Sequence, residues 1–131
     1  MDARVHDALG HYQTIDLTTT GRRTGKARRI EIALHNLGGR LLISGMPFAG
    51  RTRAWLLNIR ADPGVTLHLR ANPPIDVAGD AHEITDPEER RALLARIART
   101  WGRTDLEAMV AHSPLMEVTV PGYPDTDASS G

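Results

Sequence analysis

The chain has 131 residues, no cysteine and a formal net charge of zero, with 16 basic and 16 acidic side chains. This length predicts one domain with a sizeable core. The absence of cysteine excludes disulfides, thiolate metal sites and a cysteine nucleophile, and the balanced charge argues against a general nucleic-acid binder. No apolar run approaches a membrane span, and the first ten residues lack a signal-peptide core, so we expect a cytoplasmic protein.

The first third of the chain predicts a short helix followed by three strands. Residues 3–10 favour a helix that ends at Gly10, within an N-terminal arm of residues 1–13. Three later segments alternate apolar and polar side chains, which is typical of strands with one buried face. They span residues 14–20, 29–34 and 40–45. Short connections between them predict an antiparallel meander.

The remainder predicts three further strands and three helices. A helix from a cap at Thr52 to Arg60 is expected to stop before Pro63, since a residue that precedes proline avoids helical dihedrals. Asp86 and Glu89 have the spacing of a capping box, which predicts a long helix over residues 87–101. The other elements are expected as strands at 65–70, 75–84 and 115–120 and a short helix at 105–111.

Six strands with a few peripheral helices predict a small β-barrel. The sequence contains no internal repeat and no sign of a second domain. We therefore expect a single domain over residues 1–120. The segment 121–131 is rich in Pro, Gly, Ser and Asp and is expected to be a flexible tail that holds an isolated Tyr123.

The most informative segment is the basic loop, residues 18–29, with the sequence TTTGRRTGKARR. Cations this close repel, at ~6 Å by roughly 0.7 kcal/mol per pair even in water, so the loop either holds an anion or is a solvated turn. Gly21 and Gly25 can adopt positive φ and turn backbone N–H groups toward one anion, with the Thr24 hydroxyl as a further donor. Neither a Walker A loop nor a dinucleotide-binding fingerprint fits the spacing. Five of the 16 basic residues lie in the loop: Arg22, Arg23, Lys26, Arg28 and Arg29.

Acid–base or metal chemistry has little support in the sequence. The six histidines are scattered without metal-ligand spacing, so no metal site is expected. Ser44 lacks the Gly-x-Ser-x-Gly elbow of hydrolases. Chemistry at this protein is therefore expected to belong to a bound cofactor.

Three motifs occur in order: TTTGRRTGKAR at 18–28, GRLLISG at 39–45 and AWLLNIRADPGVTL at 54–67. Together they resemble the deazaflavin (F420)-dependent nitroreductase family of flavin and deazaflavin oxidoreductases. The resemblance covers residues 14–70 well and the remainder in general layout. It implies a mainly β (α+β) fold, a six-stranded antiparallel split β-barrel like those that bind FMN, with F420 in a groove.

The resemblance also implies roles for particular residues. The basic loop would hold the cofactor phosphate and its anionic tail, the end of the third strand would border the deazaflavin ring, and the next helix would close the groove. Ser44 would also be a candidate hydrogen-bond donor during catalysis. The residues so implied are Arg22, Arg23, Thr24, Gly25, Lys26, Arg28, Ser44, Gly45, Met46, Arg51, Trp55 and Asn58.

The charge of the loop favours F420, which carries more negative charge than the alternative cofactor FMN. The implied activity is hydride transfer from reduced deazaflavin to a quinone, nitro or enone acceptor. A non-catalytic split-barrel protein that binds F420 or a fatty-acid-like ligand is the alternative. Glu31 stands where many members of the family have proline. The expected partner is a small-molecule acceptor and not a nucleic acid; peripheral membrane contact and the choice between monomer and homodimer stay open.

Overall fold

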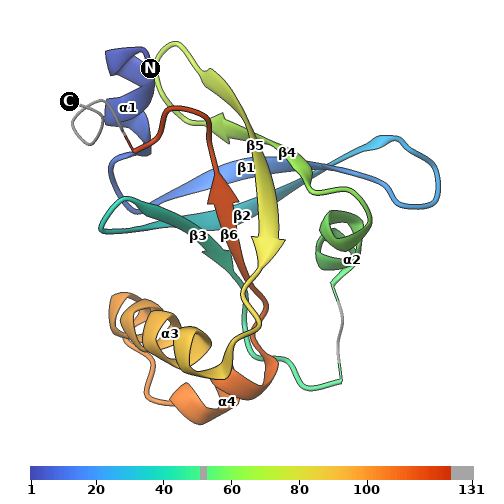
Figure 1. Ribbon diagram of the computed structural model, residues 1–131, viewed down its shortest axis with the longest axis vertical. Helices are drawn as coiled ribbons and strands as arrows, with labels where there is room; N and C mark the ends of the chain where they lie inside the picture. The colour runs from blue at the N-terminus through green and yellow to red at the C-terminus, as the bar shows by residue number, and fades with distance from the viewer. Residues whose placement is uncertain (51–52, 125–131) are drawn as a thin grey trace.

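Six antiparallel strands close into a barrel in the order β1-β2-β3-β6-β5-β4, with four helices outside it (Figure 1). The computed structural model describes residues 1–50 and 53–124. Its strands are β1 (Gln13–Thr20), β2 (Ala27–Leu37), β3 (Arg40–Ser44), β4 (Gly64–Leu69), β5 (Ile75–Glu83) and β6 (Leu115–Thr119). Its helices are α1 (Ala3–Leu9), α2 (Ala54–Ala61), α3 (Pro87–Trp101) and α4 (Leu106–His112). The predicted split β-barrel is confirmed.

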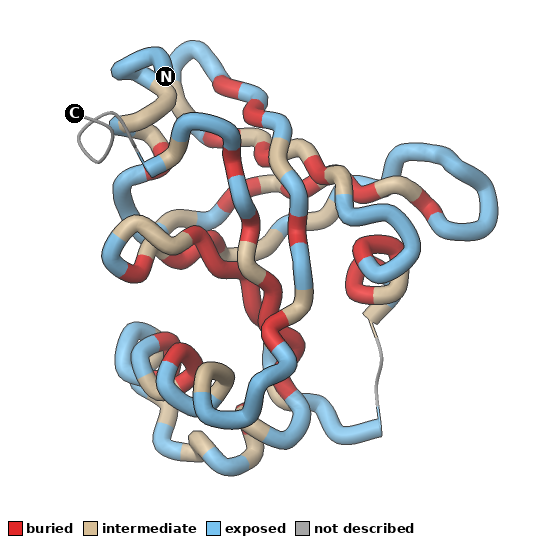
Figure 2. Tube along the Cα trace, viewed as in Figure 1, coloured by how far each residue is buried: buried red, intermediate tan, exposed pale blue. Residues whose placement is uncertain are grey.

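The predicted meander forms the first half of the barrel. β1 pairs with β2 along its whole length, and β2 pairs with β3. β1 also pairs with β4, for example at Leu17 and Leu67, and this pairing closes the barrel. The β1–β2 hairpin is long and extends past α2, and its exposed tip is visible at the right of Figure 2.

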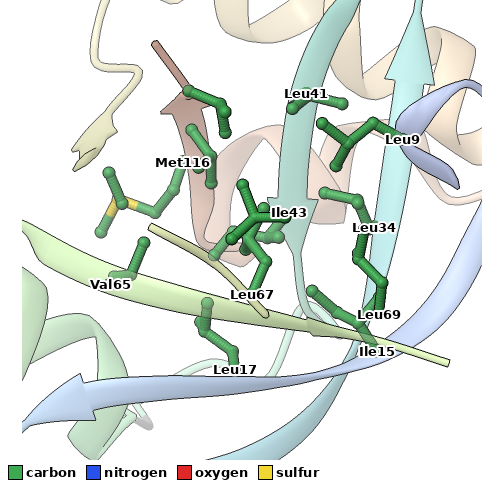
Figure 3. Close-up of a cluster of buried hydrophobic side chains, with 14 of the residues drawn as sticks. Leu9, Ile15, Leu17, Leu34, Leu41, Ile43, Val65, Leu67, Leu69 and Met116 are labelled. Atoms are coloured by element: carbon green, nitrogen blue, oxygen red, sulfur yellow. The ribbon is translucent and has the colours of Figure 1, made fainter. Parts of the chain in front are cut away.

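Alternate residues of the strands fill the barrel interior, where leucine and isoleucine side chains meet (Figure 3). Leu9 from α1 and Trp55 from α2 belong to the same cluster, so both helices are held by apolar burial. At ~25 cal/mol per Å² of apolar area buried, this burial is the main force that fixes α2 beside β1. The position of α2 matters because it forms one wall of the site described below.

A second apolar cluster lies between the outside of the barrel and the pair α3 and α4. Figure 1 shows this helix pair at one end of the molecule, below the barrel. Leu42 of β3 and Leu115 of β6 meet Leu94 and Ile97 of α3 there. α3 has the predicted bounds: the Asp86 side chain accepts from the Glu89 N–H at 2.9 Å, and Gly102 ends the helix with φ 67°. The C-terminal end of α3 thereby reaches β2, next to the end of β3.

Two sequence predictions need correction. α2 begins at Ala54 with Arg53 in the N-cap position and no side-chain cap; the predicted cap, Thr52, lies outside the described residues. Tyr123 is not isolated in a flexible tail. Its hydroxyl accepts from Asn36 Nδ2 at 2.7 Å, and its ring packs against His6 at 5.2 Å, so the chain is held to β2 and α1 up to this point.

Candidate functional site

The tip of the β1–β2 hairpin is closed by its own backbone. The Gly21 N–H donates to Lys26 O at 2.7 Å, and the Gly25 N–H donates to Gly21 O at 2.8 Å. Thr24 Oγ1 accepts from the Lys26 N–H at 3.2 Å. Gly25 has the expected positive φ of 71°, but Gly21 does not; a Cβ at Gly21 would lie 3.0 Å from Lys26 O. The predicted nest of free N–H groups is therefore wrong, because these N–H groups are used within the loop.

Asn58 of α2 fixes the hairpin to the barrel. Its Oδ1 accepts from the Arg22 backbone N–H at 3.2 Å and from Arg22 Nη1 at 3.1 Å. Its Nδ2 donates to Thr19 Oγ1 at 3.2 Å. Asn58 is only 3% exposed, so its amide acts as a buried bracket between α2 and the hairpin. The structure thus brings Arg22 and Asn58, two of the residues that the resemblance singled out, into a direct contact that orients the loop.

The remaining cations of the hairpin divide into two groups. Arg29 Nε donates to Asp16 Oδ2 at 3.0 Å, which neutralises it. The side chains of Arg23, Lys26 and Arg28 are exposed and make no hydrogen bond or ion pair with any residue that the structure describes. Mutual repulsion among such groups is relieved when an anion binds between them. The hairpin therefore offers three cations to a ligand.

A groove of about 350 Å³ runs between the hairpin and α2. We call it the anion groove, because every charged residue in its lining, among those that the structure describes, is an arginine: Arg22, Arg23, Arg28 and Arg29. Thr24, Ile30, Trp55 and Asn58 complete much of its wall. An anionic group in this groove meets positive charge without a competing carboxylate in the lining.

A second hollow, of about 410 Å³, lies on the other side of Trp55. We call it the aromatic pocket. Trp55 lines both hollows, so the two are neighbours that share part of a wall. The aromatic pocket is lined by Tyr12, Glu31, Ile32, Ala33, Ser44, Gly45, Met46, Arg53, Trp55 and Trp101. Ser44, Gly45 and Met46, at the end of β3, thus line a space that can hold a flat ring.

Ser44 is buried, and its hydroxyl already has a partner. Its Oγ donates to the Pro114 carbonyl oxygen at 2.6 Å. Its single proton is therefore directed at the backbone and away from the pocket, although its oxygen can still accept a hydrogen bond. Gly45 lies close to Arg53: a Cβ at Gly45 would lie 3.0 Å from the Arg53 guanidinium, so a larger residue would require that side chain to shift.

Glu31 lines the aromatic pocket, and its carboxylate forms an ion pair with Arg70. Its Oε2 accepts from Arg70 Nη2 at 2.6 Å, and Arg70 also donates to Asp16, the residue paired with Glu31 across β1 and β2. Hydrogen bonds from Arg70 and Arg29 hold the pKa of Asp16 below its usual range. The carboxylate at the position of the family's proline is thus one member of a four-residue ion-pair network on the outer face of the sheet.

Behind the aromatic pocket lies a buried histidine. His35 is 1% exposed, and neither ring nitrogen has a hydrogen-bond partner in the described part of the chain. Its ring packs against Tyr12 at 5.0 Å and against Trp101 at 5.2 Å. Burial lowers the pKa of His35 to about 4, so the imidazole is neutral at pH 7. His35, Tyr12 and Trp101 belong to no sequence motif and lie far apart in the chain, so no local pattern points to them.

Arg51 lies outside the described residues, so its predicted role cannot be placed in the site. Among the residues that the structure describes, no cluster of three His, Asp or Glu side chains is arranged to hold a metal ion. None of the described helices has the length and apolarity needed to cross a bilayer.

Comparisons with known proteins identify a family and a fold. The model of the F420H(2)-dependent quinone reductase family matches residues 1–120. No curated protein matches the chain by sequence. A solved structure named F420 reductase is 18% identical, with 90% of this chain and 94% of that chain covered and a TM-score of 0.67.

Two further solved structures share the fold. A Listeria innocua protein assigned as a pyridoxamine 5'-phosphate oxidase is 13% identical, with 90% of this chain and 91% of that chain covered and a TM-score of 0.66. A protein of unknown function from Agrobacterium tumefaciens is 18% identical with a TM-score of 0.67; 92% of this chain matches only 54% of that one. At these identities the likenesses establish the split-barrel fold alone.

Proposed function

We propose that this chain, which belongs to the F420H(2)-dependent quinone reductase family, reduces a quinone with F420 bound along the anion groove and the aromatic pocket. The family makes it an F420-dependent oxidoreductase. The proposal adds the acceptor and the residues that bind the cofactor.

The shape and charge of the site fit F420. The cofactor combines a flat tricyclic ring with a phosphodiester and a tail of several carboxylates. The anion groove has only arginine among its charged lining residues, and Trp55 joins it to a pocket large enough for a ring. FMN would bring a single phosphate to a hairpin with three unpaired cations, and it would leave part of that charge unmatched.

At the anionic end, we assign binding to Arg23, Lys26 and Arg28, because these cations have no competing partner in the described chain. Each charge-assisted hydrogen bond contributes roughly 1.5–3 kcal/mol. Arg22 is oriented by Asn58 and has further N–H donors that can reach an anion in the groove. Gly25 provides the turn that lets the Thr24 hydroxyl and the cations share one end of the site.

At the ring end, Ser44, Gly45 and Met46 form one edge and Trp55 the wall between the two hollows. The bound cofactor supplies the hydride, and the protein orients the ring and keeps water from it. Because the Ser44 proton is held by Pro114, Ser44 acts here as a hydrogen-bond acceptor and a positioning residue. The unpaired cations beside the arginine-lined groove carry this proposal.

A parallel fluorescence titration with F420, FMN and haem tests the cofactor assignment. We expect saturable F420 binding at low salt, with FMN weaker by at least about tenfold because fewer charge-assisted contacts form. Turnover with a naphthoquinone tests the acceptor. Tight F420 binding without turnover across quinones, nitro compounds and enones would favour a non-catalytic binding protein and contradict the reductase proposal.

A further inference from the structure

The aromatic pocket has two unlike sides. Ser44, Gly45 and Met46 form one side and come from the end of β3. Tyr12, from the α1–β1 connection, and Trp101, the last residue of α3, also line the pocket. Tyr12 is 46% exposed, although its ring packs against the buried His35 and its hydroxyl contacts Trp101. An exposed aromatic wall in a pocket is typical of a surface that a flat ligand covers.

The hydrogen bonds of Tyr12 leave its own proton available. Trp101 Nε1–H donates to the Tyr12 hydroxyl oxygen at 3.0 Å. The tyrosine O–H has no acceptor among the described residues, so it can donate to a ligand. Ser44, by contrast, donates its only proton to Pro114 at 2.6 Å. Of these two hydroxyls in the lining, the one on Tyr12 is free to serve a bound acceptor.

His35 holds this wall in place. Its ring lies 5.0 Å from Tyr12 and 5.2 Å from Trp101, tilted against both, and it makes no hydrogen bond that would hold it elsewhere. A buried polar ring without a partner is costly. Here it provides a flat, rigid backing that fixes the orientation of two aromatic rings at once.

We propose that Tyr12 and Trp101 form the acceptor-binding wall, with the Tyr12 hydroxyl hydrogen-bonded to a carbonyl oxygen of a flat, uncharged quinone and His35 as a positioning residue. This inference rests on the proposed function. Trp101 binds the face of the acceptor ring, because aromatic rings favour offset or tilted packing on one another.

The reaction balances with groups already named. The acceptor gains a hydride, which carries two electrons and one proton, from the reduced cofactor; the cofactor is oxidised and releases its second proton to solvent. Negative charge then develops on the acceptor oxygen, where the Tyr12 O–H stabilises it. A second proton from solvent completes the hydroquinone, through Tyr12, which recovers its own proton from water.

The central test compares Tyr12→Phe with a matched control, Tyr123→Phe, whose hydroxyl contacts Asn36 away from the pocket. With 1,4-naphthoquinone as acceptor, we expect Tyr12→Phe to lower kcat about 10–100-fold, because it removes one donor to a developing oxyanion. Its F420 dissociation constant, measured by fluorescence, should stay within about twofold. Tyr123→Phe should leave both values unchanged. Normal kcat in Tyr12→Phe overturns the inference.

The stacking role has a readout that needs no turnover. The chain has two tryptophans, Trp55 and Trp101. Saturable quenching of tryptophan fluorescence by the naphthoquinone should weaken strongly in Trp101→Phe, and Trp101→Leu should raise the acceptor KM about tenfold. Unchanged quenching and KM in both variants overturn the stacking role.

His35 is tested by rescue. His35→Ala should raise the acceptor KM and leave the F420 dissociation constant unchanged, and His35→Phe should restore KM because an aromatic ring again backs the wall. Equal loss in both variants contradicts the positioning role. Failure to bind F420 in the wild-type protein would instead overturn the proposed function, so the two failures are distinguishable.

Discussion

The hairpin tip and the aromatic pocket solve two different binding problems. The tip offers charge in water: Arg23, Lys26 and Arg28 are exposed and unpaired in the described chain. The pocket wall offers shape near the core: Trp101 and Tyr12 rest on a histidine that is 1% exposed. The side chains of the tip contribute little to packing, so substitutions there should weaken binding alone. The side chains of the wall contribute much to packing, so substitutions there should weaken both binding and stability.

The largest effect should come from removing the cations of the tip. The triple variant Arg23→Ala, Lys26→Ala, Arg28→Ala should lose about 100–1000-fold in F420 affinity, since several charge-assisted bonds are lost together. Its melting temperature should stay near that of the wild type. The matched control is Arg96→Ala with Arg99→Ala on α3, which should bind F420 normally. Equal binding by the triple variant and this control contradicts the role of the tip.

The wall should show its coupling to stability in acid. The pKa of His35 is about 4 in the folded protein and 6.5 as a reference, so the unfolded chain takes up the proton first as the pH falls. The stabilisation is complete above about pH 6.5 and is lost toward pH 4, on the order of 3 kcal/mol. Urea unfolding of wild type and His35→Phe across this range measures it. His35→Phe should lack this part of the pH dependence. If the free energies of unfolding of both proteins fall in parallel between pH 6.5 and pH 4, the assignment to His35 is wrong.

Substitution of Asn58, the buried bracket between α2 and the hairpin, should have an intermediate effect on F420 affinity. Asn58→Ala removes the partners of Arg22 and Thr19 and leaves a gap in a buried site. We expect a loss of about 2–3 kcal/mol in the free energy of unfolding and a weaker F420 affinity, because the hairpin loses its anchor. Asn58→Asp keeps the acceptor for Arg22 and should retain more affinity. Chemical denaturation and F420 titration measure both variants. An F420 affinity of Asn58→Asp equal to or below that of Asn58→Ala would contradict the bracket role.

The smallest expected difference between the tip and the wall is in how F420 affinity and the quinone KM respond to salt. The cations of the tip are exposed, so F420 affinity should fall about tenfold between low salt and 0.5 M, where the screening length shortens to a few ångströms. The KM for an uncharged quinone should change by less than about twofold, since its wall binds by stacking. A KM that follows salt as steeply as the F420 affinity would argue against the division.

The same contrast explains what the sequence could predict. The tip is one continuous segment, and its charge, glycines and motif were all visible along the chain. Apolar and polar residues alternate clearly along the strands, which predicted the barrel. The capping box at Asp86 and Glu89 predicted where α3 begins. The nest was not realised because hydrogen bonds within the loop use the N–H groups of Gly21, Gly25 and Lys26.

The wall was beyond a sequence-based prediction. Tyr12 and Trp101 are 89 positions apart and meet only because the second apolar cluster holds the end of α3 against β2. Neither residue has a motif, and Trp101 also fits the apolar stripe of its helix. The direction of the Ser44 hydroxyl likewise depends on Pro114, which is 70 positions away along the chain. Contacts of this kind follow from tertiary packing and leave no local pattern.

The most direct test of the division between tip and wall is a fluorescence titration of F420 into wild type, the triple cation variant and Tyr12→Phe at low salt. We predict tight saturable binding by wild type and by Tyr12→Phe, with affinities within about twofold, and a loss of about 100-fold or more in the triple variant. Equal affinity in all three proteins, or no saturable binding by the wild type, would contradict the account.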